Sequence, residues 1–172
     1  MKKLVLITGV IVSVFLLCSA FDMLDTEVKP TKTLQEKYHA SIPGWNVGLE
    51  EVYQKSLKTG KPIMANFTGS DWCGWCIRLK ASVFSQDEFK KWADENVVLY
   101  EVDFPKRFTL PNDIRQENAS LQQSLQVRGY PTVWIMNIDK KDGKYNINPL
   151  GSLSYEKSAS NFIAKANAII KK

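Results

Sequence analysis

Two cysteines three positions apart, Cys73 and Cys76, constrain the fold of this chain more than any other feature of its sequence. They follow an apolar run at 63–67, which is typical of a buried strand, and a turn at 68–71. After them, residues 77–80 continue as a helix. The sequence therefore places the pair where a strand has ended and a helix begins.

The start of a helix stabilises an anion, because its first backbone N–H groups have no partners and the helix dipole is positive there. A thiolate is such an anion. In C-x-x-C motifs at helix starts, the pKa of the first cysteine falls from about 8.5 to between roughly 3.5 and 7.5. We therefore expect Cys73 to be the attacking nucleophile at neutral pH. We expect Cys76, one turn further on and more buried, to attack the mixed disulfide and release the product.

Three other uses of this cysteine pair fit the sequence less well. A zinc site needs about four ligands, and beyond the pair the chain offers Cys18 near the N-terminus and a single distant histidine, His39. Haem attachment needs a histidine directly after the second cysteine, where this chain has Ile77. A structural disulfide this short closes almost no loop and adds little stability. We therefore predict redox chemistry by the cysteine pair itself, with no metal and no other cofactor.

The N-terminus is typical of an export signal, with a short basic start, an uncharged apolar run at 4–17 and small residues at 18–20. We favour a signal peptide at 1–20 that is cleaved after Ala20. Two alternatives stay open. The apolar run can remain as a membrane anchor, or Cys18 can be lipidated, although Leu17 is a large residue for the position before a lipidated cysteine. Each form places the domain outside the cytoplasm, in the periplasm or envelope, where disulfides persist.

The rest of the chain is predicted to hold a single domain. Residues 21–44 are polar and weakly periodic, which indicates an arm or linker, and the patterning improves over 45–172. Elements in the order α-β-α-β-α-β-β-α predict an α/β fold with a partly parallel sheet covered on both faces by helices. An additional short strand near the start is an alternative.

The boundaries of the expected elements come from apolar periodicity and from helix and strand breakers. The first expected helix ends at Gly60 and has Leu49, Val52, Tyr53 and Leu57 on its inner face. A later helix is expected to start with a capping box at Ser85–Glu88 and to turn Phe89, Trp92 and Ala93 inward. The other expected elements are, in chain order, a strand at 63–67, a helix at 77–80, a strand at 97–102, a loop at 104–118, a helix at 119–126, a strand at 133–136, a hairpin turn at 139–144, a weaker strand, and a closing helix from about Tyr155.

Charge and composition exclude some function classes. Apolar residues make up 44% of the chain, which argues against disorder. The net charge is +5, but the sequence has no block of like charges and no basic stripe interleaved with aromatic residues. We read this mild basicity as a solvated surface and expect no nucleic-acid partner.

The segment 72–76 (WCGWC), between a buried strand and the helix that follows, resembles the active site of the thioredoxin superfamily, and of its exported bacterial members in particular. The segment 129–132 (GYPT) resembles the cis-proline loop of the family. The resemblance covers about Trp45 to the C-terminus. It implies a thioredoxin fold, with a central mixed sheet and helices on both faces, and a thiol–disulfide oxidoreductase that works as a reductase rather than an oxidase.

The resemblance also implies roles for the residues around the cysteines. It places Pro131 in a cis peptide bond that faces the cysteines and leaves the backbone of Tyr130 free to pair with an extended substrate segment. Trp72, Gly74 and Trp75 are expected to contact the substrate.

A thiol–disulfide oxidoreductase needs protein partners. The expected partners are proteins with disulfides or thiols and a redox partner that resets the pair, with a membrane tether if the N-terminal segment is retained. Two alternatives remain: an oxidase or isomerase of the same fold, and a client-binding module whose redox activity is incidental.

Three features depart from the family pattern. The dipeptide between the cysteines is Gly-Trp, where thioredoxins proper have Gly-Pro, and this dipeptide tunes the reduction potential. Asn66 stands about where many thioredoxins place a buried Asp that accepts a proton, and an amide cannot accept one at neutral pH. Water, Glu101 or Asp103 could replace it, although structural roles are the simpler expectation for both carboxylates. The loop at 104–118 lengthens the interval between the two motifs and could shape substrate choice.

Overall fold

The computed structural model describes residues 38–171. The predicted signal peptide, its cleavage site, Cys18 and most of the predicted arm lie outside the described residues. Within residues 38–171, no helix is both long enough and apolar enough to cross a membrane.

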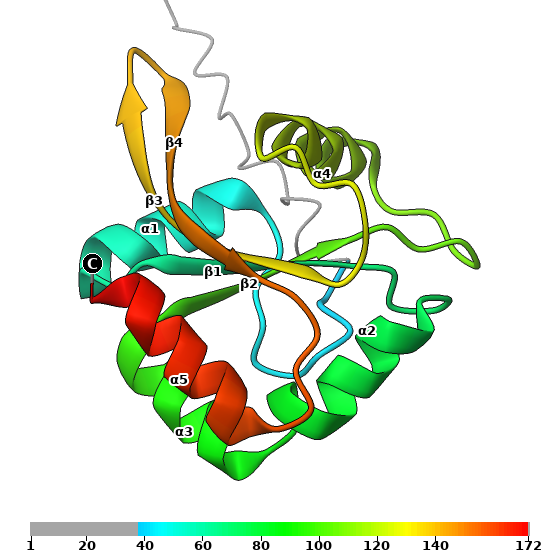
Figure 1. Ribbon diagram of the computed structural model, residues 1–172. Helices are drawn as coiled ribbons and strands as arrows, with labels where there is room; N and C mark the ends of the chain where they lie inside the picture. Colours follow the sequence, from blue (N-terminus) through cyan, green and yellow to red (C-terminus); the bar gives the residue numbers. More distant parts are fainter. Residues whose placement is uncertain (1–37, 172) are drawn as a thin grey trace, which may run out of the picture. The chain divides into compact units, whose positions relative to one another are not determined.

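A four-stranded sheet lies at the centre of the domain, in the order β2-β1-β3-β4 (Figure 1). β1 (Ile63–Thr68) pairs in parallel with β2 (Val98–Asp103) and antiparallel with β3 (Thr132–Lys141). β3 pairs antiparallel with β4 (Lys144–Leu153). The predicted mixed sheet is confirmed.

Helices cover both faces of the sheet. α1 (Leu49–Thr59) and α4 (Asn112–Ser124) pack on one face. The other face is covered by α2 (Gly74–Leu79), the π-helical turn η2 (Lys80–Phe84), α3 (Asp87–Asn96) and α5 (Ala159–Ile170).

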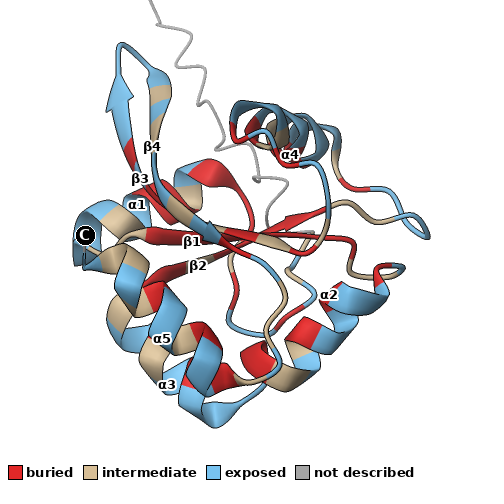
Figure 2. Ribbon diagram, in the orientation of Figure 1, coloured by how far each residue is buried: buried red, intermediate tan, exposed pale blue. Residues whose placement is uncertain are grey.

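β1 separates two cores, because successive side chains of a strand point to opposite faces. Ile63, Ala65 and Phe67 point toward α1 and α4, whereas Met64 packs among α2, α3 and α5. All six residues of the strand are buried, as expected for a central strand with both faces covered (Figure 2).

α1 ends at Gly60 as predicted. Gly60 has a φ of 69°, a left-handed conformation that glycine adopts without strain, and its N–H bonds the carbonyl of Ser56. The prediction that Leu57 faces inward is wrong, because Leu57 is 60% exposed. Ser56, seven positions after Leu49, takes the inward place in the last turn, and its hydroxyl donates to the carbonyl of Lys61.

The capping box predicted at Ser85–Glu88 does not form. α3 begins at Asp87 after Gln86, which makes no side-chain capping bond. The backbone N–H of Ser85 instead bonds the carbonyl of Lys80 and closes the π-helical turn. Ser85 therefore closes the π-helical turn and does not cap α3.

The loop predicted at 104–118 is too long, because residues 112–118 form the first half of α4. Two prolines at 105 and 111 favoured a loop. Pro111 precedes the first helical residue directly, and there its missing N–H takes no bond away from the helix. The irregular segment is confined to residues 104–111, and we call it the 104–111 loop.

The hairpin turn is shorter than predicted, because β3 continues to Lys141 and β4 begins at Lys144. Asp142 and Gly143 alone make the turn, with φ values of 52° and 76°, as a two-residue type I′ hairpin requires. The prediction missed the polar end of β3. The closing helix also begins later than predicted, at Ala159, where Ser158 caps it.

The predicted arm at 21–44 is described only from Tyr38 onward. There Ile42 is buried in the core that includes Trp45, so the packed domain begins before the predicted boundary. Asn46 forms an isolated parallel bridge with Tyr100, which is all that the structure shows of an additional strand near the start.

Candidate redox site

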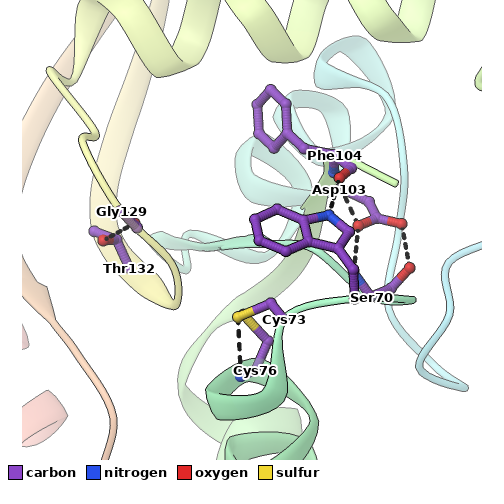
Figure 3. Close-up of a disulfide and its surroundings, with 8 residues drawn as sticks. Ser70, Cys73, Cys76, Asp103, Phe104, Gly129 and Thr132 are labelled. Atoms are coloured by element: carbon purple, nitrogen blue, oxygen red, sulfur yellow. Dashed lines mark hydrogen bonds between the residues drawn. A yellow bond between two sulfur atoms is a disulfide. The ribbon is translucent and has the colours of Figure 1, made fainter. Parts of the chain in front are cut away.

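Cys73 and Cys76 form a disulfide at the beginning of α2 (Figure 3). Cys73 is the N-cap residue of this helix, and its Sγ accepts a hydrogen bond from the backbone N–H of Cys76 over 3.2 Å. The two residues are 7% and 5% exposed. The first turn of α2 carries no acidic side chain, so no nearby charge on the helix opposes a thiolate at Cys73.

Gly69 shapes the turn before the cysteines. Its carbonyl accepts hydrogen bonds from the backbone N–H groups of Trp72 and Cys73, at 3.2 and 2.8 Å. The indole of Trp72 packs directly on this glycine, and a Cβ at position 69 would lie 2.4 Å from a ring atom. Sequence reasoning treated Gly69 only as a turn residue and missed this role, because it depends on where the tryptophan ring lies.

Trp72 connects the disulfide turn to two other segments. Its indole N–H donates to the carbonyl of Phe104 over 2.7 Å. Its ring meets the ring of Tyr130 edge-on, with centroids 5.9 Å apart. The ammonium of Lys106 lies 3.9 Å from the ring centroid, in a cation–π arrangement.

The peptide bond between Tyr130 and Pro131 is cis, in the geometry that the resemblance implies. The ring of Tyr130 stacks on Phe104 with centroids 5.3 Å apart, and its hydroxyl accepts a hydrogen bond from Gln122. Figure 3 shows this loop, with Gly129 and Thr132 labelled, together with the disulfide. The contact between Tyr130 and Trp72 holds the two segments together.

Trp75 is 54% exposed, so it is accessible for the substrate contact that the resemblance implies. One side of its ring packs against Tyr155, and the guanidinium of Arg78 lies 4.7 Å from the ring centroid. Ile77 is also exposed, and so is Gly74 between the cysteines. The nearly buried cysteines thus lie next to exposed, largely apolar side chains.

Four buried polar side chains lie on the sheet face that α2 covers. Asn66 and Thr68 of β1 are paired in register with Glu101 and Asp103 of β2, so all four point the same way.

Hydrogen bonds hold the two carboxylates of this group. Asp103 accepts from the backbone N–H and hydroxyl of Ser70 and from the backbone N–H of Phe104 (Figure 3). Glu101 accepts from the backbone N–H and hydroxyl of Ser41, at 2.6 and 2.8 Å. Burial raises the pKa of both carboxyls, and these hydrogen bonds oppose the rise.

A small cavity of about 20 Å³ lies beside Cys76, with Asn66, Ser41 and Lys80 among its lining residues. This volume can hold one water molecule. The Oδ1 atom of Asn66 is buried and has no hydrogen-bond partner among the described residues. Asn66 therefore lies beside Cys76, where a proton acceptor is needed, but its amide cannot be that acceptor.

Residues 38–171 contain no group of three His, Cys, Asp or Glu side chains arranged to hold a metal ion. His39 is exposed.

Comparison with known proteins places both motifs within one family. The family model for the thioredoxin-like domain matches residues 49–154. The disulfide bond reductase DsbH of Chlamydia pneumoniae is 34% identical over 106 residues, which cover 61% of this chain and 64% of DsbH. The thioredoxin-related protein DsbJ of the same organism is 27% identical over 123 residues, covering 72% of this chain and 35% of DsbJ. The chain thus spans less than two thirds of either relative.

Solved structures agree with this family. A DsbH oxidoreductase superposes with a TM-score of 0.64 at 28% identity, over 77% of this chain and 87% of that one. A thioredoxin from Thermus thermophilus superposes with a TM-score of 0.52 at 16% identity, over 72% and 84% of the two chains, which shows the fold alone. The predicted thioredoxin fold is confirmed, and the chain belongs to the thioredoxin-like family.

Proposed function

We propose that this protein is a thiol–disulfide oxidoreductase that reduces protein disulfides outside the cytoplasm. The observation that carries the proposal is the Cys73–Cys76 disulfide, nearly buried at a helix start and surrounded by exposed apolar side chains. The similarity to a protein named as a disulfide bond reductase supports the direction.

The reaction begins with the reduced pair. The Cys73 thiolate attacks one sulfur of a client disulfide, forms a mixed disulfide and releases the other client sulfur as a thiolate. Cys76 then loses its proton and attacks the sulfur of Cys73. The Cys73–Cys76 disulfide forms, the second client thiolate leaves, and two electrons have passed to the client. A dithiol partner reduces the pair again.

The proton of Cys76 leaves through the small cavity beside it. One water molecule in this cavity can bridge Cys76 and Ser41, which both line it. The hydroxyl of Ser41 donates to Glu101, and burial raises the pKa of that carboxyl toward the range in which it accepts a proton. Glu101 thereby takes the task that Asn66 cannot perform.

The client lies on the surface formed by Trp72, Gly74 and Trp75 and pairs with the backbone of Tyr130 beside Pro131. The exposed indole of Trp75 and the exposed backbone at Gly74 give an extended segment access to Cys73.

Export rests on the signal predicted at 1–20. Mass spectrometry of the protein purified from envelope fractions distinguishes its three forms: a new N-terminus at Phe21, a diacylglycerol adduct on Cys18, or an intact N-terminus. A full-length chain recovered only from the cytoplasm would contradict export.

The proposal is tested by trapping the mixed disulfide. Reduced Cys76→Ala protein should capture a disulfide-bonded client through Cys73 and hold it, because the resolving thiol is missing. Cys73→Ser protein should capture none, and the wild-type protein should release two free client thiols per turnover. A client-binding module is the competing class, and it would retain its clients in the variant that lacks both cysteines.

A further inference from the structure

Each of the two tryptophans beside Cys73 carries a cation on its ring. The ammonium of Lys106 lies 3.9 Å from the centroid of the Trp72 ring, and the guanidinium of Arg78 lies 4.7 Å from that of Trp75. Both tryptophans and both cationic residues are exposed. A polypeptide that reaches Cys73 across these rings therefore meets a positive charge at each of them.

The two cations are held in place by different parts of the fold. Lys106 belongs to the 104–111 loop, and its backbone N–H donates to the carboxylate of Asp71 in the turn before the cysteines. Arg78 follows Trp75 by three positions on α2, a spacing that puts the two side chains on one side of a helix. Their contacts with the rings are cation–π contacts, which engage the charge without pairing it to an anion.

Neighbouring acidic side chains leave these two charges uncompensated. Within residues 38–171, neither cation takes part in an ion pair. The carboxylate of Asp71 accepts backbone N–H groups of the 104–111 loop, including that of Arg107, whose own charge is opposite. Glu156, next to the tyrosine that packs on Trp75, pairs with Lys165. The two carboxylates of β2 are only 1% exposed, and the first turn of α2 carries no acidic residue.

We infer that the four side chains of Trp72, Trp75, Arg78 and Lys106, which we call the cationic tryptophan surface, select client segments whose reactive cysteine is flanked by acidic residues. The inference rests on the proposed function. The rings contact the apolar part of the client chain, and the client carboxylates pair with the guanidinium and the ammonium. A client with basic residues at the same places is repelled, so the surface discriminates by repulsion as well as by attraction.

The test uses one peptide disulfide in three forms, with Glu, Gln or Lys at the second position on either side of the cysteine. The measured quantity is the second-order rate constant for reduction by the reduced protein, followed through the free peptide thiol that is released. The Gln peptide is neutral and reports any general effect of a substitution. The ratio of the Glu rate to the Gln rate, compared between protein variants, then isolates the charge, because the intrinsic reactivity of each peptide cancels.

Two protein variants with the same loss of charge are compared with the wild type. The first combines Arg78→Gln with Lys106→Gln. The second, the matched control, combines Lys58→Gln with Lys141→Gln. Both control residues are exposed and lie at the other end of the sheet. Lys58 precedes the start of β1, and Lys141 lies beyond Met136, which pairs with the first residue of that strand. The cysteines follow its last residue.

At low ionic strength, the ratio of the Glu rate to the Gln rate should fall roughly threefold to tenfold in the first variant, as expected for the loss of two exposed charge pairs. The control should keep the wild-type ratio. High salt should remove the difference between the wild type and the first variant, because salt screens exposed charges.

An unchanged ratio in the first variant overturns the inference, and so does an equal fall in both variants, which would reflect net charge alone. A wild-type protein that reduces the Lys peptide as fast as the Glu peptide overturns it too. In each of these cases the peptides are still reduced and the proposed function stands. Failure to reduce any of the three peptides overturns the proposed function, and the assignment of this surface with it.

Discussion

The indole N–H of Trp72 donates to the backbone carbonyl of Phe104 over 2.7 Å, and this bond joins the residue before Cys73 to the first residue of the 104–111 loop. Phe104 in turn stacks on Tyr130, next to the cis peptide bond. Three segments that are distant in sequence therefore meet at one tryptophan. The proposed client surface depends on this contact.

Replacing Trp72 by Phe keeps an aromatic ring but removes the N–H group. We expect the 104–111 loop to open more often and the free energy of unfolding to fall by about 1 kcal/mol, the typical value of one hydrogen bond. Amide hydrogen exchange of residues 104–111 and urea denaturation measure the two effects. Trp75→Phe is the control, because the indole N–H of Trp75 bonds nothing within residues 38–171. Equal exchange in both variants would show that the bond does not hold the loop.

Adding a methyl group at Gly69 should move Trp72. A Cβ there falls 2.4 Å from the ring, so the indole must leave its position or the turn must shift. We expect Gly69→Ala to lower the free energy of unfolding by roughly 1–3 kcal/mol, as overpacking does, and to change the tryptophan fluorescence. Gly129→Ala adds the same group where nothing lies within 4 Å. An unchanged Gly69→Ala spectrum and stability would contradict the described turn.

Glu101 should make stability depend on pH. Burial raises the pKa of its carboxyl in the folded state, Asp103 adds to the rise, and the Ser41 bonds and Lys80 oppose it. Tyr38 also faces this pair of carboxylates. The folded protein therefore binds more protons than the unfolded chain, and the free energy of unfolding should fall as pH rises from about 4.5 through the folded-state pKa.

Glu101→Gln removes that contribution, so its stability relative to the wild type should increase with pH across this window. Denaturation curves at pH 4 to 8 measure the difference. A constant difference would mean that Glu101 titrates alike in both states.

Glu101→Gln should also slow the second redox step. If Glu101 accepts the proton of Cys76, its loss should slow release of the client thiol at least about tenfold near neutral pH, with the deficit shrinking at high pH, where solvent hydroxide takes the proton. Stopped-flow resolution of a preformed mixed disulfide reports this step. Glu117→Gln is the control, because burial also raises the pKa of Glu117, but this carboxylate bonds Leu49 and Tyr100 on the other face of the sheet. Equal slowing in both variants would leave Glu101 with a structural role only.

The order of the elements and the place of the cysteines could be predicted because they depend on local patterns: apolar runs, a terminating glycine at 60, and a C-x-x-C after a strand. The errors at Leu57, Ser85 and residues 112–118 arose where tertiary packing decided a boundary. Ser85 closes the π-helical turn and so does not cap the next helix. Pro111 stands directly before a helix and does not interrupt one.

The arrangement of the buried polar side chains near the cysteines could not be predicted from local patterns. Asn66 and Glu101 become neighbours only through the parallel register of β1 and β2. The bond from the indole of Trp72 to the carbonyl of Phe104 likewise joins segments that are distant in sequence. The sequence showed these residues but not their relationships.

The central claim is that the cysteine pair works as a reductant, and its equilibrium reduction potential tests this most directly. The protein is equilibrated in glutathione buffers of known ratio, and the fluorescence of the adjacent tryptophans reports the oxidised fraction. We predict a potential of about −230 to −270 mV, within the range of reductive thioredoxin-like proteins. A potential near about −120 mV would make the pair a strong oxidant and would contradict the reductase assignment.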